Sequence, residues 1–159
     1  MGHRAVVWWT VRLILTSKQG IHVHTNNLNA TLPAMNERTA ARIAAVFGAL
    51  AVGLGAFGAH GLKGILMRND TAGIWQTAVF YHFIHAVMLY VLSGSRPTRY
   101  GPWYSFLAGI LIFSGSLYVL ALTNVRWLGA ITPLGGVSFI VGWLWLAICP
   151  GADRAEPAG

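Results

Sequence analysis

Residues 103–122 read WYSFLAGILIFSGSLYVLAL, a stretch with no charged side chain. A helix of about 20 mainly apolar residues is long enough to cross the hydrocarbon core of a bilayer. Three more stretches have this property, at about 42–59, 72–92 and 128–149, and none carries Asp, Glu, Lys or Arg in its interior. The sequence therefore predicts four transmembrane helices.

The composition supports a membrane protein. Of the 159 residues, 55% are hydrophobic and 9% are charged, whereas an ordinary soluble domain carries about 25% charged residues. The net charge of +7 comes from basic residues scattered beside the apolar stretches. Nucleic-acid binding needs a basic patch or stripe instead, so we expect the lipid bilayer, and no nucleic acid, as the partner.

Short connections join the four predicted spans. They read GLKGILMRNDT at 61–71, SGSRPTRYGP at 93–102 and TNVRW at 123–127. Short connections make neighbouring helices antiparallel. The expected fold is therefore an all-α, up-down-up-down bundle of four transmembrane helices.

Aromatic and basic residues place the helix ends. Trp and Tyr collect at membrane interfaces, and Lys and Arg collect on the cytoplasmic side. The aromatic residues near the ends of the spans are Trp75, Tyr90, Trp103, Tyr104, Trp127, Trp143 and Trp145. The side with both termini holds Arg38, Arg42, Arg96, Arg99 and Arg154, and the other holds Lys63, Arg68 and Arg126. This bias predicts cytoplasmic termini.

The predicted domain organisation has three parts. Residues 1–34 lack a span and a helical or strand period, and we expect either a disordered extension or an over-extended start of the reading frame. Residues 35–150 form the transmembrane domain, with Asn36 or Thr39 as the N-cap of its first helix. Residues 151–159 form a polar tail.

Small residues recur at helical spacing in the predicted spans. In lipid, such rows let helix backbones approach closely, so we expect packing, or a homo-oligomer, through the first and fourth helices. The rows are Ala45, Ala49 and Gly53; Ala51, Gly55 and Ala59; and Gly135, Ser138 and Gly142. The third span adds Ser114, Gly115 and Ser116, and Pro133 predicts a kink in the fourth.

Four ordered motifs carry a family resemblance. They are GAFGAHGLKG at 55–64, WQTAVFYHFIHA at 75–86, FSGSLYVLALT at 113–123 and LGAITPLGG at 128–136. With these motifs, residues 38–148 resemble the YgdD family of small membrane proteins, a family of unknown function (domain of unknown function 423). The resemblance implies a four-helix protein of the bacterial inner membrane and no established reaction, ligand or cofactor. The matching positions are Gly58, His60, Gly61, Trp75, Gln76, Tyr81, His82, His85, Ser114, Gly115, Ser116, Pro133 and Gly135.

The second span contains two histidines, His82 and His85, three residues apart on one helix face. Ionisable residues within a span usually face the bundle interior, and neutral imidazole can donate one hydrogen bond and accept another. We expect both histidines to make packing contacts, with Ser114, Ser116, Thr132 or backbone groups as partners. This interpretation favours a structural or accessory membrane component that is not an enzyme.

Two other interpretations stay open. Gln76, His82 and His85 sample successive depths of one helix, as a proton or small-solute path would. Alternatively, His82 and His85 bind a metal or haem, with His60 some 15 Å away at about 1.5 Å per residue. Zinc and copper sites need three or four donors, and no carboxylate lies inside a span. We therefore predict no metal site and no cofactor.

Overall fold

The computed structural model describes residues 35–95 and 98–149, and the predictions for residues 1–34 and 151–159 fall outside this part of the chain. The described residues form helices and no strand. In chain order these are α2 (Glu37–Ala59), α3 (Lys63–Arg68), α4 (Ala72–Ser93), α5 (Tyr100–Gly109), a π-helical turn η1 (Ile110–Ser114), α6 (Gly115–Thr123), a 3-10 helix η2 (Arg126–Ala130) and α7 (Thr132–Ile148).

Four helical segments are long and apolar enough to cross a membrane. They cover Glu37–Ala59, Ala72–Ser93, Tyr100–Thr123 and Arg126–Ile148. Large apolar side chains cover their outer surfaces, including Leu111, Leu134 and Ile148, as contact with lipid tails requires. The predicted all-α fold with four transmembrane helices is confirmed.

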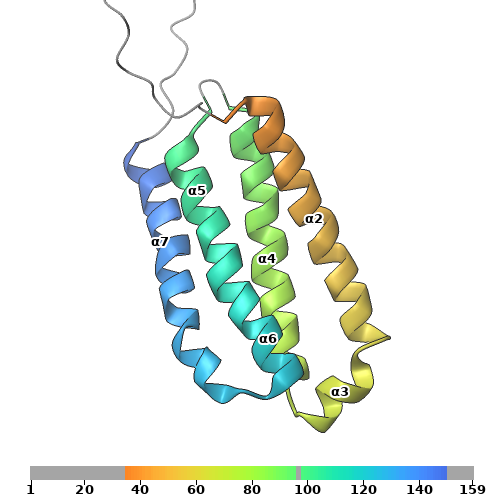
Figure 1. Cartoon of the computed structure of the whole chain (residues 1–159). Coiled ribbons are helices and arrows are strands. Elements are labelled where there is room, and N and C mark those ends of the chain that lie inside the picture. The colour runs from red at the N-terminus through yellow and green to blue at the C-terminus, as the bar shows by residue number, and fades with distance from the viewer. Residues whose placement is uncertain (1–34, 96–97, 150–159) are drawn as a thin grey trace, which may run out of the picture. The chain divides into compact units, whose positions relative to one another are not determined.

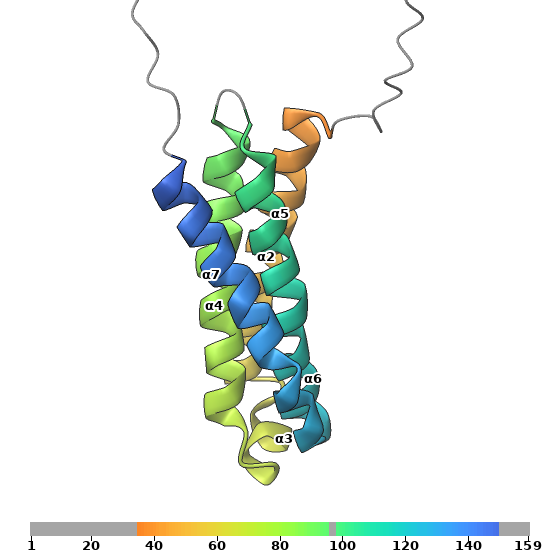
Figure 2. The same ribbon diagram turned by 90° about the vertical axis from the view of Figure 1, so that its left-hand side faces the viewer.

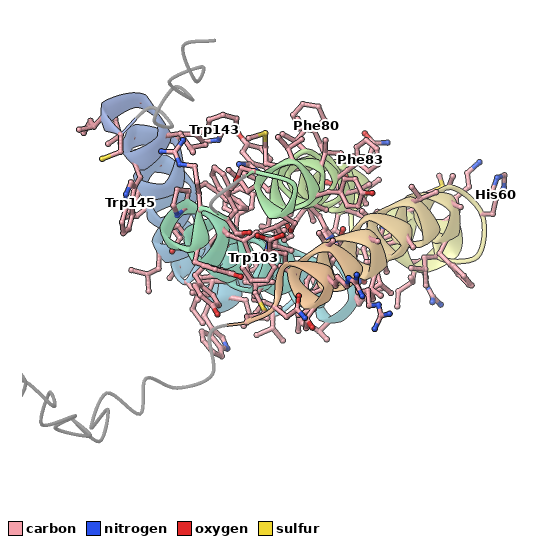
Figure 3. The ribbon with its side chains drawn as sticks, turned by 90° about the horizontal axis from the view of Figure 1, so that it is seen from above. His60, Phe80, Phe83, Trp103, Trp143 and Trp145 are labelled. Atoms are coloured by element: carbon pink, nitrogen blue, oxygen red, sulfur yellow. The ribbon has the colours of Figure 1, made fainter. Side chains whose placement is uncertain are left out.

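The long helices stand side by side in the order α7, α5–α6, α4, α2 (Figure 1). α2 and α5–α6 run in one direction, and α4 and α7 run in the other. A quarter turn brings α7 to the front (Figure 2), and the view from above places α7 and α2 at opposite sides (Figure 3). α2 packs chiefly against α4, and α7 packs chiefly against α5 and η1. The ring of helices is therefore open between α2 and α7.

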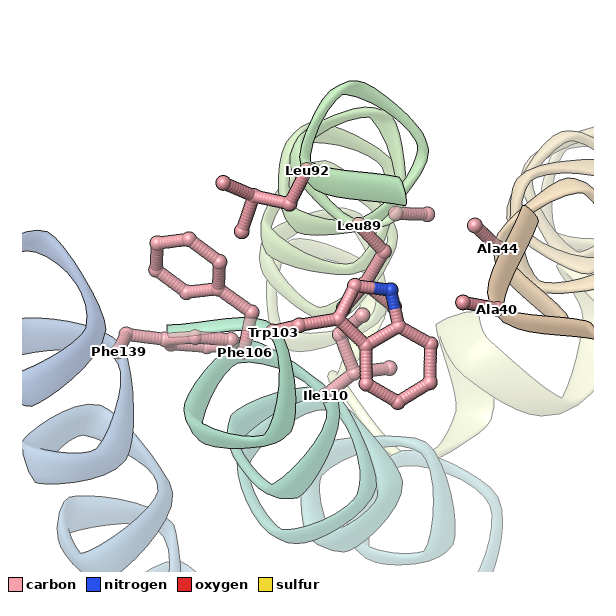
Figure 4. Packing of buried hydrophobic residues seen from close by; sticks show 9 residues of the cluster. Ala40, Ala44, Leu89, Leu92, Trp103, Phe106, Ile110 and Phe139 are labelled. Atoms are coloured by element: carbon pink, nitrogen blue, oxygen red, sulfur yellow. The ribbon is translucent and has the colours of Figure 1, made fainter. Parts of the chain in front are cut away.

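The centre of the bundle is built on two aromatic rings of α5. Trp103 and Phe106 are fully buried and pack with Leu89 of α4 and Ile110 of η1 (Figure 4). Ala40 of α2 joins the same cluster, because its short side chain lets α2 approach the indole. This cluster connects α2 to the rest of the bundle.

The first turns of α2 and α7 follow the local preferences of residues at helix starts. Asn36 caps α2, and its side-chain oxygen accepts a hydrogen bond from the Arg38 N–H at 3.0 Å, so one of the two predicted N-caps is confirmed. Pro133 lies in the first turn of α7, directly after η2, where its missing N–H has no partner to lose. The predicted kink inside the helix is therefore wrong, and Pro133 marks a helix start.

Two tryptophans expected at the membrane interface lie inside the bundle. Trp75 is 3% exposed and Trp103 is 0% exposed. The indole N–H of Trp75 donates to the Leu54 carbonyl at 3.0 Å, and that of Trp103 donates to the Ser93 hydroxyl at 3.1 Å. Because the protein itself supplies these acceptors, neither ring needs water, and both tryptophans pack between helices.

The small-residue row of the fourth helix packs inside the chain. A methyl group added at Gly135 would lie 2.3 Å from the backbone nitrogen of Phe113, and one added at Gly142 would lie 2.5 Å from the Phe106 ring. Both glycines are buried. This row lets α7 approach α5 and η1, so it is not free for a partner chain, contrary to the expectation that it contributes to an oligomer.

Candidate functional site

His85 is buried on α4 and uses both of its ring nitrogens. Nδ1 lies 2.7 Å from the Tyr81 carbonyl oxygen, which can only accept, so Nδ1 carries the proton. Nε2 then accepts a hydrogen bond from the indole N–H of Trp143 on α7 at 3.2 Å. The imidazole is thus a neutral bridge between α4 and α7.

Aromatic rings enclose the same imidazole. It stacks on Phe139 of α7 with ring centres 3.6 Å apart and planes 14° apart, and Phe106 of α5 lies 5.3 Å away. Sequence reasoning placed Trp143 at the interface and did not connect it with His85. The spacing of His85 and Trp143 in the chain gives no signal of their contact, because they lie on different helices.

His82 is also buried but points to other neighbours. Its Nδ1 lies 3.3 Å from the hydroxyl of Tyr118 on α6, and its ring makes an edge contact with Phe47 of α2 at 5.7 Å between centres. Its Nε2 is buried without a hydrogen-bond partner in the described residues. One helical turn therefore sends His85 toward α7 and His82 toward α2 and α6.

The predicted serine and threonine partners form no hydrogen bond with the histidines in the described part of the chain. Ser116 of α6 bonds instead to Thr132 of α7 at 2.9 Å. The hydroxyl of Ser114 is buried and has no partner among the described residues. The histidines bond instead to Tyr118, to Trp143 and to a backbone carbonyl. The phenol and the indole are longer than a serine or threonine side chain, so they reach farther across the space between helices.

The third transmembrane segment contains a π-helical turn that the sequence did not reveal. This turn, Ile110–Ser114, lies between α5 and α6 and ends at Ser114, whose hydroxyl has no hydrogen-bond partner in residues 35–95 and 98–149. π-Helical turns inside α-helices occur often at functional sites. The turn and the buried Nε2 of His82 are features of the bundle interior that no local pattern predicts.

Gln76 does not join the histidines. Its side chain is exposed on the outer surface of α4, whereas both imidazoles are buried. Tyr81 is 39% exposed, and its ring packs on Phe113 and Phe139 with centres 4.6 and 6.0 Å apart. A single internal path through Gln76, His82 and His85 is therefore absent from this part of the structure.

The motif GAFGAHGLKG at 55–64 covers the end of α2 and the turn that follows it. His60 is exposed there, and Figure 3 shows it at the outer edge, far from the centre of the bundle. Gly58 supports the buried indole of Trp75, because an added methyl group would lie 2.2 Å from its nitrogen. Gly61 packs against the Phe57 ring. These glycines make close packing, and His60 does not approach the other two histidines.

The described residues contain no group of three or more His, Cys, Asp or Glu side chains that could hold a metal ion. The protonated Nδ1 and hydrogen-bonded Nε2 of His85 leave no free lone pair for a ligand. Metal or haem binding through Nε2 of His85 would require this imidazole to give up the hydrogen bond from Trp143.

Comparison with known proteins identifies one family. A family described as a protein of unknown function (DUF423) matches residues 54–136. The UPF0382 membrane protein YwdK of Bacillus subtilis is 47% identical over 113 residues, which cover 67% of this chain and 90% of the relative. UPF0382 membrane proteins of Staphylococcus haemolyticus and Staphylococcus epidermidis are 48% and 52% identical over 104 residues, which cover 62% of this chain and 84% of each relative. No solved structure matches.

Proposed function

This chain belongs to the DUF423 family of membrane proteins of unknown function, and we propose that it is a structural or accessory membrane component that assembles with further copies of itself through α2. The observation that carries the proposal is the position of α2 at the open side of the bundle, where α4 is its main neighbour. A transmembrane helix that packs on one neighbour leaves most of its surface for lipid or a partner.

The outward face of α2 has the residues that close helix packing in lipid requires. Ala40 and Ala44 are buried in the cluster that includes α4, while Ala45 and Ala49 are exposed. A methyl group added at Gly53 would meet no atom within 4 Å. Small residues four apart let two membrane helices approach closely. The row of Ala45, Ala49 and Gly53 is therefore the interface that we propose.

The oligomeric state of detergent-purified protein, measured by native mass spectrometry, tests this proposal. We expect an oligomer for the natural chain and monomers for Ala49→Ile and Gly53→Ile, because a branched side chain separates the two backbones. Ala147→Ile, on the exposed surface of α7, is the matched control and should keep the oligomer. An oligomer that survives both α2 substitutions would reject this interface.

We propose the bacterial inner membrane as the location, with cytoplasmic termini and no enzymatic activity. The five-to-three excess of basic residues on the side of the termini supports the orientation. The donor and acceptor pairs of the bundle interior support a packing role, since Tyr81, Trp143 and Tyr118 occupy three of the four imidazole nitrogens.

A proton path is a second candidate function. It is favoured by the buried Nε2 of His82 and the buried hydroxyl of Ser114, both without partners in the described residues, and by the π-helical turn beside Ser114. Proteoliposomes loaded with a pH-sensitive dye test it. The proton-path hypothesis requires a flux that His82→Gln abolishes without a change in melting temperature, and no flux from the natural chain would reject it.

A further inference from the structure

A groove of ≈ 520 Å³ opens on the outer surface between α2 and α4. Alanine and glycine residues of α2 line one side, and Phe80 and Phe83 of α4 line the other (Figure 3). Leu66 of α3 lines the groove near the end where α2 finishes and α4 begins. The volume falls within the range of about 300–1,000 Å³ that is typical of small-molecule sites.

Polarity changes along the length of this groove. Gln76 lies four residues after the start of α4, about 6 Å along the helix axis, while Phe83 lies about 17 Å along it. In the part of the chain that the structure describes, the Gln76 side chain makes no hydrogen bond. An amide without a partner in an apolar medium is costly. The occupant therefore needs an acceptor near the end of the groove and an apolar portion farther along.

Positive charge lies at the same end. Lys63 is one turn before Leu66 on α3, so the two share a helix face, and Arg68 closes this helix. Both basic side chains are exposed, and neither forms an ion pair within residues 35–95 and 98–149. Among these residues, Asp70 is the one carboxylate at this end. An occupant with a negative group here complements the charge.

We propose that the groove binds an acyl chain of a phospholipid with a negatively charged headgroup. An ester carbonyl of the lipid accepts a hydrogen bond from the Gln76 amide, and its phosphate lies near Lys63 and Arg68. The acyl chain follows the groove toward Phe83. An amphiphile of this kind matches the order of charge, amide and apolar wall along the groove.

A second copy of the chain fits this groove less well. A copy with the same orientation in the membrane would bring its own Lys63 and Arg68 to this end of the groove. Backbone carbonyls within its helices are already bonded, so they are poor acceptors for the Gln76 amide. The lipid supplies both the negative group and the free carbonyl.

Native mass spectrometry of the detergent-purified protein, with phosphatidylglycerol and phosphatidylcholine of equal chain length as probes, tests the proposal. We expect preferential retention of phosphatidylglycerol. Lys63→Gln should lower this preference about fivefold, the effect of one basic side chain near an anionic surface, and should leave phosphatidylcholine binding unchanged. Gln76→Leu should weaken the binding of both lipids.

Filling the groove is the second arm of the experiment. Ala56 is exposed and lines the groove, so Ala56→Phe should abolish retention, whereas Ala147→Phe on α7 should not. Equal retention of the two lipids by the natural chain, or unchanged binding in Ala56→Phe, would overturn the proposal. A cross-linked dimer of Ala72→Cys in a Cys149→Ser background would also overturn it, because Ala72 lines the groove from α4, away from the proposed α2 interface, and a second copy would then occupy the groove.

Discussion

Gly135 shows how one hydrogen atom in place of a side chain sets a helix–helix distance. Its α-carbon faces the backbone of Phe113 in the π-helical turn, and a methyl group would lie 2.3 Å from the Phe113 nitrogen. Backbone cannot rotate away as a flexible side chain can. The approach of α7 to η1 therefore depends on this glycine.

Gly135→Ala should destabilise the bundle by about 1–3 kcal/mol, the usual cost of overpacking a well-packed interior. Gly136→Ala is the matched control, since its methyl group would meet the Phe113 ring at an ordinary 3.8 Å. Thermal unfolding in detergent, followed by circular dichroism, measures both. Equal melting temperatures for the two variants would show that α7 can move away from η1 without a loss of stability.

The hydrogen bond from Trp143 to His85 is the second feature at the residue scale. Trp143→Phe keeps an aromatic ring on α7 and removes the N–H donor, which leaves Nε2 of His85 unpaired. Hydrogen bonds between transmembrane helices contribute about 0.6 kcal/mol on average and about 1.7 kcal/mol at most. We expect a loss of stability in this range.

Steric trapping in bicelles or mixed micelles measures the free energy of unfolding of a membrane protein, and it can resolve the loss expected for Trp143→Phe. Trp145→Phe provides the comparison, because Trp145 lies on the same helix and its ring packs against Gly101. If both substitutions lower stability equally, the effect comes from the lost ring area and not from the bond to His85.

At the scale of elements, the connection between α3 and α4 holds the end of α6. The Asn69 amide donates to the carbonyls of Ala121 and Leu122 at 3.0 and 3.1 Å, and the buried Thr71 hydroxyl donates to Ala121 at 2.8 Å. The last carbonyls of a helix have no partner within it. Side chains some 50 residues earlier in the chain satisfy them and fix α6 against α4.

Thr71→Val keeps the shape of the side chain and removes the donor. We expect a loss of about 0.5–1.5 kcal/mol, the net contribution of a typical hydrogen bond. Thr77→Val is the matched control, because Thr77 is exposed and donates only to Gly73 one turn earlier in its own helix. The rate of amide hydrogen exchange at the end of α6, measured by mass spectrometry, should rise for Thr71→Val and not for Thr77→Val. An unchanged rate for Thr71→Val would contradict a capping role.

At the scale of the whole molecule, the two ends of the bundle face opposite sides of the membrane. Cys149, the single cysteine of the chain, is exposed at the end of α7. With cytoplasmic termini, a membrane-impermeant maleimide should label it in inverted vesicles and not in intact cells. Asn124→Cys in a Cys149→Ser background moves the thiol to the opposite end and should reverse the pattern. Labelling of Cys149 from outside intact cells would reverse the proposed orientation.

The sequence by itself determined the four spans and their antiparallel order, and it limited the N-cap of α2 to Asn36 or Thr39, because hydrophobic length, short connections and capping are local properties. It also identified the family through four motifs. It did not determine which face of each helix lies inside. When a helix is apolar nearly all round, its hydrophobic pattern does not say which face packs inward.

The tertiary structure decided which face of each helix turns inward and which helices contact each other. It placed Tyr118 beside His82 and Trp143 beside His85, across 36 and 58 residues of chain. It also buried Trp75 and Trp103, and it left Gln76 in a groove on the outer surface. These contacts depend on the packing of large rings against small residues between helices, and no segment contains that information on its own.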